Sequence, residues 1–198
     1  MFESYESGQS HRAKLEFGTK SFMEKQIYVI TGGPGFGKTE LINELRLKGY
    51  LCSDEFARDT IEKQLETGGD LLPWKRPKHF QEEILRLRKD FDESVPDHTI
   101  AFADRGIPDQ LAFASYKGFG TPEILKKSAE KYRYAPFVFV TPPWPEIFVN
   151  DSIRYETFEE AILIHHVVLE TYLRLNYQII ELPLISVSER SAFILQTI

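Results

Sequence analysis

One eight-residue stretch, GGPGFGKT at residues 32–39, limits what this chain can fold into more than any other feature. It fits the pattern G-x-x-x-x-G-K-[ST], which binds phosphate when it lies between a strand and a helix. An apolar, β-rich run at residues 26–31 precedes it, and a helical pattern with Leu41, Ile42 and Leu45 follows it. We therefore predict a buried strand, a phosphate-binding loop (P-loop) and a helix.

The residue types explain how such a loop binds a nucleotide. Glycines allow the backbone to turn its N–H groups inward, and the N-terminus of the following helix adds positive potential. Lys38 is expected to reach the β- and γ-phosphates, and the Thr39 hydroxyl is expected to bind Mg²⁺. The predicted nucleotide-binding residues are Gly32, Gly33, Pro34, Gly35, Phe36, Gly37, Lys38, Thr39 and Glu40.

Composition and charge narrow the class of protein. A chain of 198 residues with 42% hydrophobic residues fits one domain, or one domain with a small lid. The net charge of −6 argues against a nucleic-acid-binding protein, which usually carries a basic face. The single cysteine, Cys52, excludes an internal disulfide and suits the cytoplasm. No apolar segment approaches the roughly 18 residues that a membrane-spanning helix needs.

The order of the expected elements predicts the fold class. Residues 1–22 are polar and lack the apolar region of a signal peptide, so we interpret them as a flexible N-terminal arm before a domain at 23–198. Strands alternate with helices along that domain, which implies a parallel sheet covered on both faces. The expected strands lie at 26–31, 50–53, 100–103, 137–140 and 178–182, and the later helices at 57–65, 80–95, 109–116, 122–132, 157–175 and 188–194.

Charged residues follow the third expected strand, in the segment IAFADRG. Ligands of a parallel α/β sheet bind at the carboxyl ends of its strands. Asp104 therefore resembles the acidic residue that holds Mg²⁺ directly or through water. The next residue is Arg105, whose guanidinium stays protonated and cannot activate water as a base. It can bind phosphate in a bidentate manner, which favours phosphoryl transfer over hydrolysis.

Two further segments supply candidate site residues. After the second strand, Asp54 or Glu55 is a candidate to accept a proton from a hydroxyl, and Arg58 to hold an anionic group. A capping carboxylate and a solvated helix charge explain these residues equally well. After the fourth strand, residues 144–158 resemble a small helical lid, from which Arg154 can neutralise charge on the transferring phosphates. The alternative for Arg154 is a surface ion pair with an acidic neighbour.

Two other signals have plainer explanations. His165 and His166 with Glu170 lie in an apolar helical pattern and lack a zinc-binding motif, so packing is the better interpretation. Trp144 lies beside prolines in a loop, where a ring can stack on a ligand, but a packed or half-buried role is more common.

Several segments together resemble a known family. VITGGPGFGKTELINELRLKGY, DEFARDTIEKQL, HFQEEIL, FADRGIPDQLAFA, YRYAPFVFV, DSIRYETFEEA and ELPLISVSERSAFI occur in the order seen in small AAA-domain ATPases. The resemblance covers about residues 26–195, and the family is related to the nicotinamide-riboside kinase domain of the bacterial NAD regulator. The same segments also resemble those of a GTP- and phosphoinositide-binding regulator of photoreceptor trafficking.

The resemblance implies a kinase-like P-loop NTPase with five parallel strands and a small helical lid. It implies that Gly32 to Thr39 bind the triphosphate, that Asp104 and Arg105 act as a pair, and that Arg154 is the lid arginine. Glu55 and Arg58 are implied to face the second substrate. Phe36 and Glu40 depart from the commoner Ser or Ala and Thr, and the departure at Glu40 affects the expected contact with the α-phosphate.

Three functions follow from these residues. The first is a Mg²⁺- and ATP-dependent phosphotransferase that acts on a small, nucleoside-like or other hydroxyl-bearing acceptor, with GTP as an alternative donor. The second is a regulatory protein whose bound nucleotide alters a protein or lipid partner. The third is a slow ATPase or GTPase, which Arg105 disfavours. The pattern N/T-K-x-D of common guanine-specific switches is absent from the sequence, which argues against a Ras-like GTPase.

Overall fold

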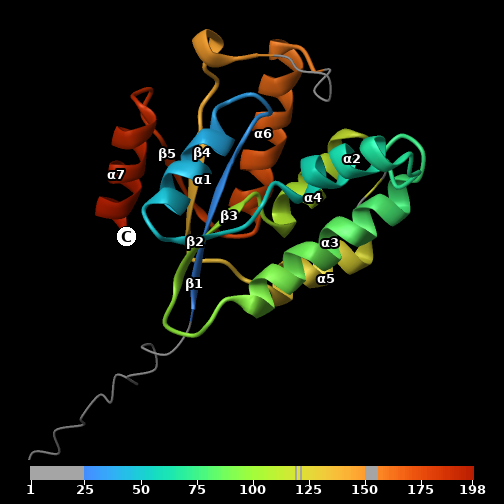
Figure 1. The fold of residues 1–198 in the computed structure, drawn as a ribbon, viewed down its shortest axis with the longest axis horizontal. Helices are drawn as coiled ribbons and strands as arrows, with labels where there is room; N and C mark the ends of the chain where they lie inside the picture. The colour runs from blue at the N-terminus through green and yellow to red at the C-terminus, as the bar shows by residue number, and fades with distance from the viewer. Residues whose placement is uncertain (1–24, 119, 121, 150–155) are drawn as a thin grey trace, which may run out of the picture.

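A single parallel sheet organises the protein. The computed structural model describes residues 25–118, 120, 122–149 and 156–198. In this part of the chain the strands lie in the order β2-β3-β1-β4-β5, and every neighbouring pair is parallel (Figure 1). The expected parallel α/β sheet is confirmed. Its strands are β1 (Gln26–Gly32), β2 (Leu51–Cys52), β3 (Ile100–Asp104), β4 (Phe137–Thr141) and β5 (Gln178–Glu181).

The helices follow the expected order, with ends that differ by a few residues. The segment 68–76 between the second and third helices is irregular, as its two glycines and Pro73 predict. A short 3-10 helix, η1 (Pro145–Ile147), follows β4. The α-helices are α1 (Lys38–Leu47), α2 (Phe56–Thr67), α3 (Pro77–Ser94), α4 (Ile107–Tyr116), α5 (Glu123–Lys131), α6 (Phe158–Arg174) and α7 (Val187–Thr197).

Helices cover the sheet on both faces because side chains alternate along each strand. On β1, Tyr28 and Ile30 face the core beneath α1 and α7, whereas Ile27 and Val29 face the core beneath α4 and α6. Figure 1 shows α1 and α7 on one side of the strands and α6 on the other. The helices α2, α3 and α5 extend the second side beyond the sheet. Among the described residues, no helix is both long enough and apolar enough to cross a bilayer.

The first turn of each of the last two helices is fixed by side chains. Thr157 Oγ1 accepts the Glu160 N–H at 3.2 Å, and the Glu160 carboxylate accepts the Thr157 N–H at 2.8 Å. Ser186 and Glu189 form the same reciprocal arrangement at the start of α7. Each pair satisfies backbone donors that a helix N-terminus otherwise leaves unpaired. The capped turn places α7 beside α1, next to the loop that follows β1.

The strand order brings the two most informative segments together. β1 is central and pairs with β3, so that Ile30 lies opposite Asp104 in the register. The loop after β1 and the acidic end of β3 therefore emerge side by side at the carboxyl edge of the sheet. That edge is where open α/β sheets bind their ligands.

The last turn of α1 offers a matched pair of leucines for a stability test. Leu45 is fully buried against the sheet, whereas Leu47 is 85% exposed. We expect Leu45→Ala to lower the free energy of unfolding by about 2–5 kcal/mol, because it removes core contacts and leaves a cavity. We expect Leu47→Ala to change it by less than about 0.5 kcal/mol. Denaturant unfolding of both variants measures the difference, and equal losses would contradict this packing.

Candidate active site

The loop between β1 and α1 depends on glycine at two positions for different reasons. Gly37 is the N-cap of α1 and has φ 74°, a left-handed conformation that side chains strain. Gly33 lies so close to its surroundings that an added Cβ would come within 2.4 Å of the Phe36 ring and 2.6 Å of the Ala161 carbonyl oxygen. Larger residues at either position would distort the loop.

Phe36 anchors this loop from below. Its side chain is 1% exposed and packs with Phe148, Phe158 and His165, at ring-centroid distances of 6.4, 5.9 and 5.8 Å. Its departure from the commoner small residue is therefore a packing feature: the ring fills the space between the loop and α6. We name Phe36, Phe148, Phe158 and His165 the aromatic cluster.

His165 belongs to the core of this cluster, as the packing interpretation expects. Its side chain is 3% exposed, and burial lowers its pKa to about 4, with smaller contributions from the neighbouring His166 and Lys38. The imidazole is therefore neutral at pH 7. Among the described residues, no group of three or more His, Cys, Asp or Glu side chains has the arrangement of a metal site.

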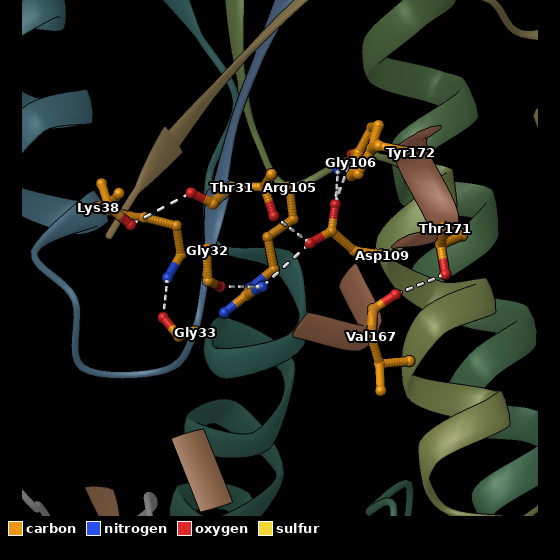
Figure 2. Close-up of polar contacts among 11 residues, drawn as sticks. Thr31, Gly32, Gly33, Lys38, Arg105, Gly106, Asp109, Val167, Thr171 and Tyr172 are labelled. Carbon is orange, nitrogen blue, oxygen red and sulfur yellow. Dashed lines mark hydrogen bonds and ion pairs between the residues drawn. The ribbon is translucent and has the colours of Figure 1, made fainter. Parts of the chain in front are cut away.

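The two reactive side chains of the loop point in different directions. Lys38 is buried, and its Nζ donates to the Gly33 carbonyl oxygen at 2.7 Å (Figure 2). The Thr39 side chain lies at the exposed edge of the loop, where its Oγ1 donates to Glu55 Oε2 at 3.3 Å. Glu40 is exposed as well. The Lys38 ammonium group thus contacts the backbone of the loop, whereas the Thr39 hydroxyl points toward the start of α2.

Asp104 is a buried carboxylate at the end of β3. The residue is 2% exposed, and its Oδ1 is buried without a hydrogen-bond partner among the described residues. Its backbone N–H donates to Ser53 Oγ at 2.9 Å. Burial and, after it, the nearby negative charge of Glu55 raise the pKa of Asp104 to about 6, against the opposing effect of Lys38. An unpaired buried oxygen of this kind is suited to a cation or to a hydrogen-bond donor.

Arg105 is held in place by its neighbours. It adopts φ 64°, an uncommon conformation outside glycine. Its Nη1 donates to the Gly32 carbonyl oxygen and to Asp109 Oδ1, each at 3.0 Å (Figure 2). The side chain is 8% exposed. The structure therefore ties Arg105 to the start of the loop, and its expected contact with phosphate remains a prediction.

Asp109 is the residue that receives these contacts, and we did not select it from the sequence. It is fully buried and accepts four hydrogen bonds. Burial acts to raise its pKa, but the charges of Arg105 and Arg88 and the hydrogen bonds from Thr31 and Tyr172 hold the pKa below its usual value. Figure 2 shows its carboxylate between Arg105 and Tyr172. Thr31 Oγ1 donates at 2.5 Å, Arg105 Nη1 at 3.0 Å, the Gly106 N–H at 2.8 Å and the Tyr172 hydroxyl at 2.6 Å.

The carboxylates after β2 take different positions. Asp54 is exposed and pairs with Arg46 Nη2 at 3.0 Å, on the side of α1. Glu55 is half-buried and faces Thr39 and the charge of Asp104. Arg58 Nε donates to Glu62 Oε1 at 2.8 Å, one turn further along α2. Of the two candidate proton acceptors, the structure thus brings Glu55 to the loop.

The predicted lid can be located only in part. Residues 144–149 and 156–158 are described, and they include η1 and two members of the aromatic cluster, Phe148 and Phe158. These two rings lie 5.2 Å apart. Arg154 lies outside the described residues, as does the N-terminal arm at 1–22, so their roles remain predictions.

A pocket of about 330 Å³ opens beside the loop, on the side of α7. Four of its residues come from outside the loop and the first turn of α1. Ile147 and Val149 belong to the predicted lid segment, whereas Val187 and Arg190 of α7 were not predicted from the sequence. Its lining residues are Gly35, Phe36, Gly37, Lys38, Thr39, Glu40, Ile147, Val149, Val187 and Arg190.

The residues present fit a magnesium ion. Mg²⁺ prefers oxygen ligands and is usually held by one or two protein groups together with substrate phosphates. The Thr39 hydroxyl and the orphaned Asp104 Oδ1 supply such oxygens. These two side chains would hold the ion, which would screen the charge of bound phosphates.

The strand order and the loop define an α/β fold of the P-loop NTPase type, in its kinase-like form. The model of a family described as an AAA domain matches residues 27–190. The protein therefore belongs to this AAA-domain family, as the sequence resemblance implied. No curated protein matches the chain.

Solved structures of P-loop kinases share the fold. The NadR protein in complex with NR has a TM-score of 0.63 and 16% identity, with 87% of this chain and 51% of that chain covered. This chain thus spans about half the length of the NadR structure. Deoxyadenosine kinase from M. mycoides with bound dCTP has a TM-score of 0.58 and 15% identity, with 87% of this chain and 97% of that chain covered. Shikimate kinase from Acinetobacter baumannii in complex with shikimate has a TM-score of 0.56 and 15% identity, with 87% of this chain and 92% of that chain covered.

Because the pKa of Asp104 is raised, we expect the free energy of unfolding of the nucleotide-free protein to depend on pH. The folded protein holds the proton of Asp104 more tightly than the unfolded chain does. The contribution of this residue to the free energy of unfolding therefore falls as the pH rises from about 4 to about 6. The substitution Asp104→Asn removes this effect. We therefore expect the free energy of unfolding of Asp104→Asn, minus that of the unmodified protein, to increase by up to about 3 kcal/mol between pH 4 and pH 7. Chemical denaturation at several pH values measures this, and a pH-independent difference would contradict it.

Proposed function

We propose that this protein is a Mg²⁺-dependent phosphotransferase that moves a phosphoryl group from ATP or GTP to a small hydroxyl-bearing acceptor. The observation that carries the proposal is the 3.3 Å contact between Thr39 Oγ1 in the loop and Glu55 Oε2 at the start of α2. A phosphate-binding element and a carboxylate suited to accept a proton meet at one point. Transfer between two bound substrates requires such an arrangement.

The phosphate side of the proposed reaction is formed by the loop. Its backbone N–H groups and the N-terminus of α1 attract the triphosphate. Lys38 is 3% exposed and bonded to the Gly33 carbonyl oxygen, and we propose that its ammonium turns to the terminal phosphates when they bind. Arg105 adds a fixed positive charge beside Gly32. These cations neutralise the charge that spreads over the transferring phosphoryl group.

The acceptor side is formed by Glu55 and Arg58. A carboxylate that hydrogen-bonds to the acceptor hydroxyl orients it toward the phosphorus and takes its proton as the new P–O bond forms. The bond from the γ-phosphorus to the bridging oxygen breaks, and the nucleoside diphosphate leaves. We propose Glu55 for this role because Asp54 faces Arg46 instead. Arg58 then contacts an anionic or polar part of the acceptor.

One residue supports transfer over hydrolysis, and two of the similar structures decide which acceptors to test first. The residue after Asp104 is an arginine, which cannot activate water as a base. Structures with the same fold include the NadR protein in complex with NR and a deoxyadenosine kinase, both of which concern nucleoside-type molecules. We therefore place nucleoside-like compounds first among the acceptors to test, with ATP before GTP.

Nucleotide binding is tested by thermal stabilisation of Lys38→Ala, with Lys48→Ala at the exposed end of α1 as the control. Ligands that bind only the native state raise its melting temperature. We expect ATP or GTP analogues with Mg²⁺ to stabilise the unmodified protein and Lys48→Ala equally, and Lys38→Ala far less.

The same titration separates the candidate functions. An acceptor that adds stabilisation to that of the nucleotide supports the phosphotransferase. Stabilisation by triphosphate alone, with no compound from a panel of nucleosides, nucleotides and sugars adding to it, would contradict the phosphotransferase and favour the regulatory protein.

The role of Glu55 is tested by Glu55→Gln, with the adjacent Asp54→Asn as the matched control. We expect Glu55→Gln to lower the rate of transfer on the order of 10²–10⁴-fold, because an amide cannot accept the proton. We expect its affinity for the nucleotide to change by less than about 3-fold, since the amide oxygen still accepts the bond from Thr39. Equal effects of both substitutions on the turnover rate would assign Glu55 no special role.

A further inference from the structure

Arg190 in the first turns of α7 is a buried cation beside the P-loop that no step above uses. The residue is 3% exposed, and its Nε is buried without a hydrogen-bond partner among the described residues. Its guanidinium carbon lies 5.4 Å from the centre of the Trp144 ring. Burial lowers its pKa, but a guanidinium remains charged at neutral pH.

The guanidinium of Arg190 faces the N-terminus of α1. A Cβ added to Gly37, the N-cap of that helix, would lie 3.4 Å from Nη1 and 3.5 Å from Nη2 of Arg190. Two sources of positive potential, the helix end and the arginine, thus meet at one side of the pocket. Within the described part of the chain, Arg190 forms no ion pair with a carboxylate. Such a site favours an anionic ligand, because a buried charge is costly unless it is paired.

The position of Arg190 indicates which part of a nucleotide it meets. The pocket that it lines includes Glu40 and the first turn of α1 but not Asp104 or Glu55. Arg190 therefore faces the end of the phosphate chain that points away from the proposed acceptor. Glu40 occupies the loop position where Ser or Thr commonly contacts the α-phosphate, and a carboxylate cannot make that contact with an anion.

We propose that Arg190 binds the phosphate next to the nucleoside and supplies the contact that Glu40 cannot make. Trp144 supports the guanidinium on its other side through a cation–π contact. Ile147, Val149 and Val187 line the same pocket and give the nucleoside an apolar surface. The inference rests on the proposed nucleotide binding, and it identifies the residue that distinguishes a nucleotide from a bare polyphosphate.

The test compares the binding of Mg²⁺–ADP, Mg²⁺–ATP and Mg²⁺–pyrophosphate to the full chain by calorimetry. The variants are Arg190→Gln, Arg190→Lys and the control Arg174→Gln, which removes an exposed arginine of α6. Pyrophosphate is expected to occupy only the part of the site that Lys38 reaches. We expect Arg190→Gln to weaken ADP and ATP binding about 10–100-fold, because a charge-assisted pair is lost, and pyrophosphate binding by less than about 3-fold. Arg190→Lys recovers part of the loss, and Arg174→Gln changes nothing.

Three outcomes would overturn the inference. Unchanged nucleotide affinity in Arg190→Gln, while the unmodified protein binds ATP, refutes the role of Arg190 and leaves the proposed function intact. If Arg190→Gln loses affinity for pyrophosphate and for nucleotides equally, and its melting temperature without ligand is also lower, Arg190 has a structural role. If the unmodified protein binds no nucleoside triphosphate, the proposed function and this inference both fail.

Discussion

The carboxylate of Asp109 is the interaction on which the rest of the site depends. Four donors converge on it: Thr31 from β1, Arg105 and Gly106 from the end of β3, and Tyr172 from α6. The same guanidinium nitrogen of Arg105 also bonds to Gly32, where the P-loop begins. One buried acid thus fixes the relative positions of two strand ends and a helix. Breaking a buried ion pair of this kind typically costs about 3–5 kcal/mol.

Around this fixed centre, the loop itself is positioned by packing. Phe36 packs with Phe148, Phe158 and His165. The Phe36 ring and the Ala161 carbonyl oxygen leave no room for a side chain at Gly33. Lys38 belongs to the loop and begins α1, Arg190 belongs to α7, and Glu55 lies at the start of α2. Binding of phosphate and acceptance of a proton can therefore be altered by separate substitutions.

The sequence predicted the fold and the position of the P-loop between a strand and a helix, because both depend on local patterns. The spacing of glycines before Lys38, the alternation of strands and helices, and Asp104 at a strand end are all readable from neighbouring residues. Asp109 and Arg190 were missed because their roles arise from contacts across the fold. Asp109 carried one weak signal, its place three residues after Gly106 at a helix start. For Arg190, nothing in the sequence indicated that α7 would pack beside α1.

The central claim is that the terminal phosphoryl group goes to an acceptor hydroxyl and not to water. Turnover of ATP in ¹⁸O-labelled water, followed by phosphorus NMR and mass spectrometry with a panel of nucleoside-like acceptors, tests this claim directly. The account predicts that one acceptor accelerates ATP consumption and becomes phosphorylated without incorporating ¹⁸O. Conversion of ATP to ADP and ¹⁸O-labelled inorganic phosphate alone, at one rate with and without acceptors, would contradict it.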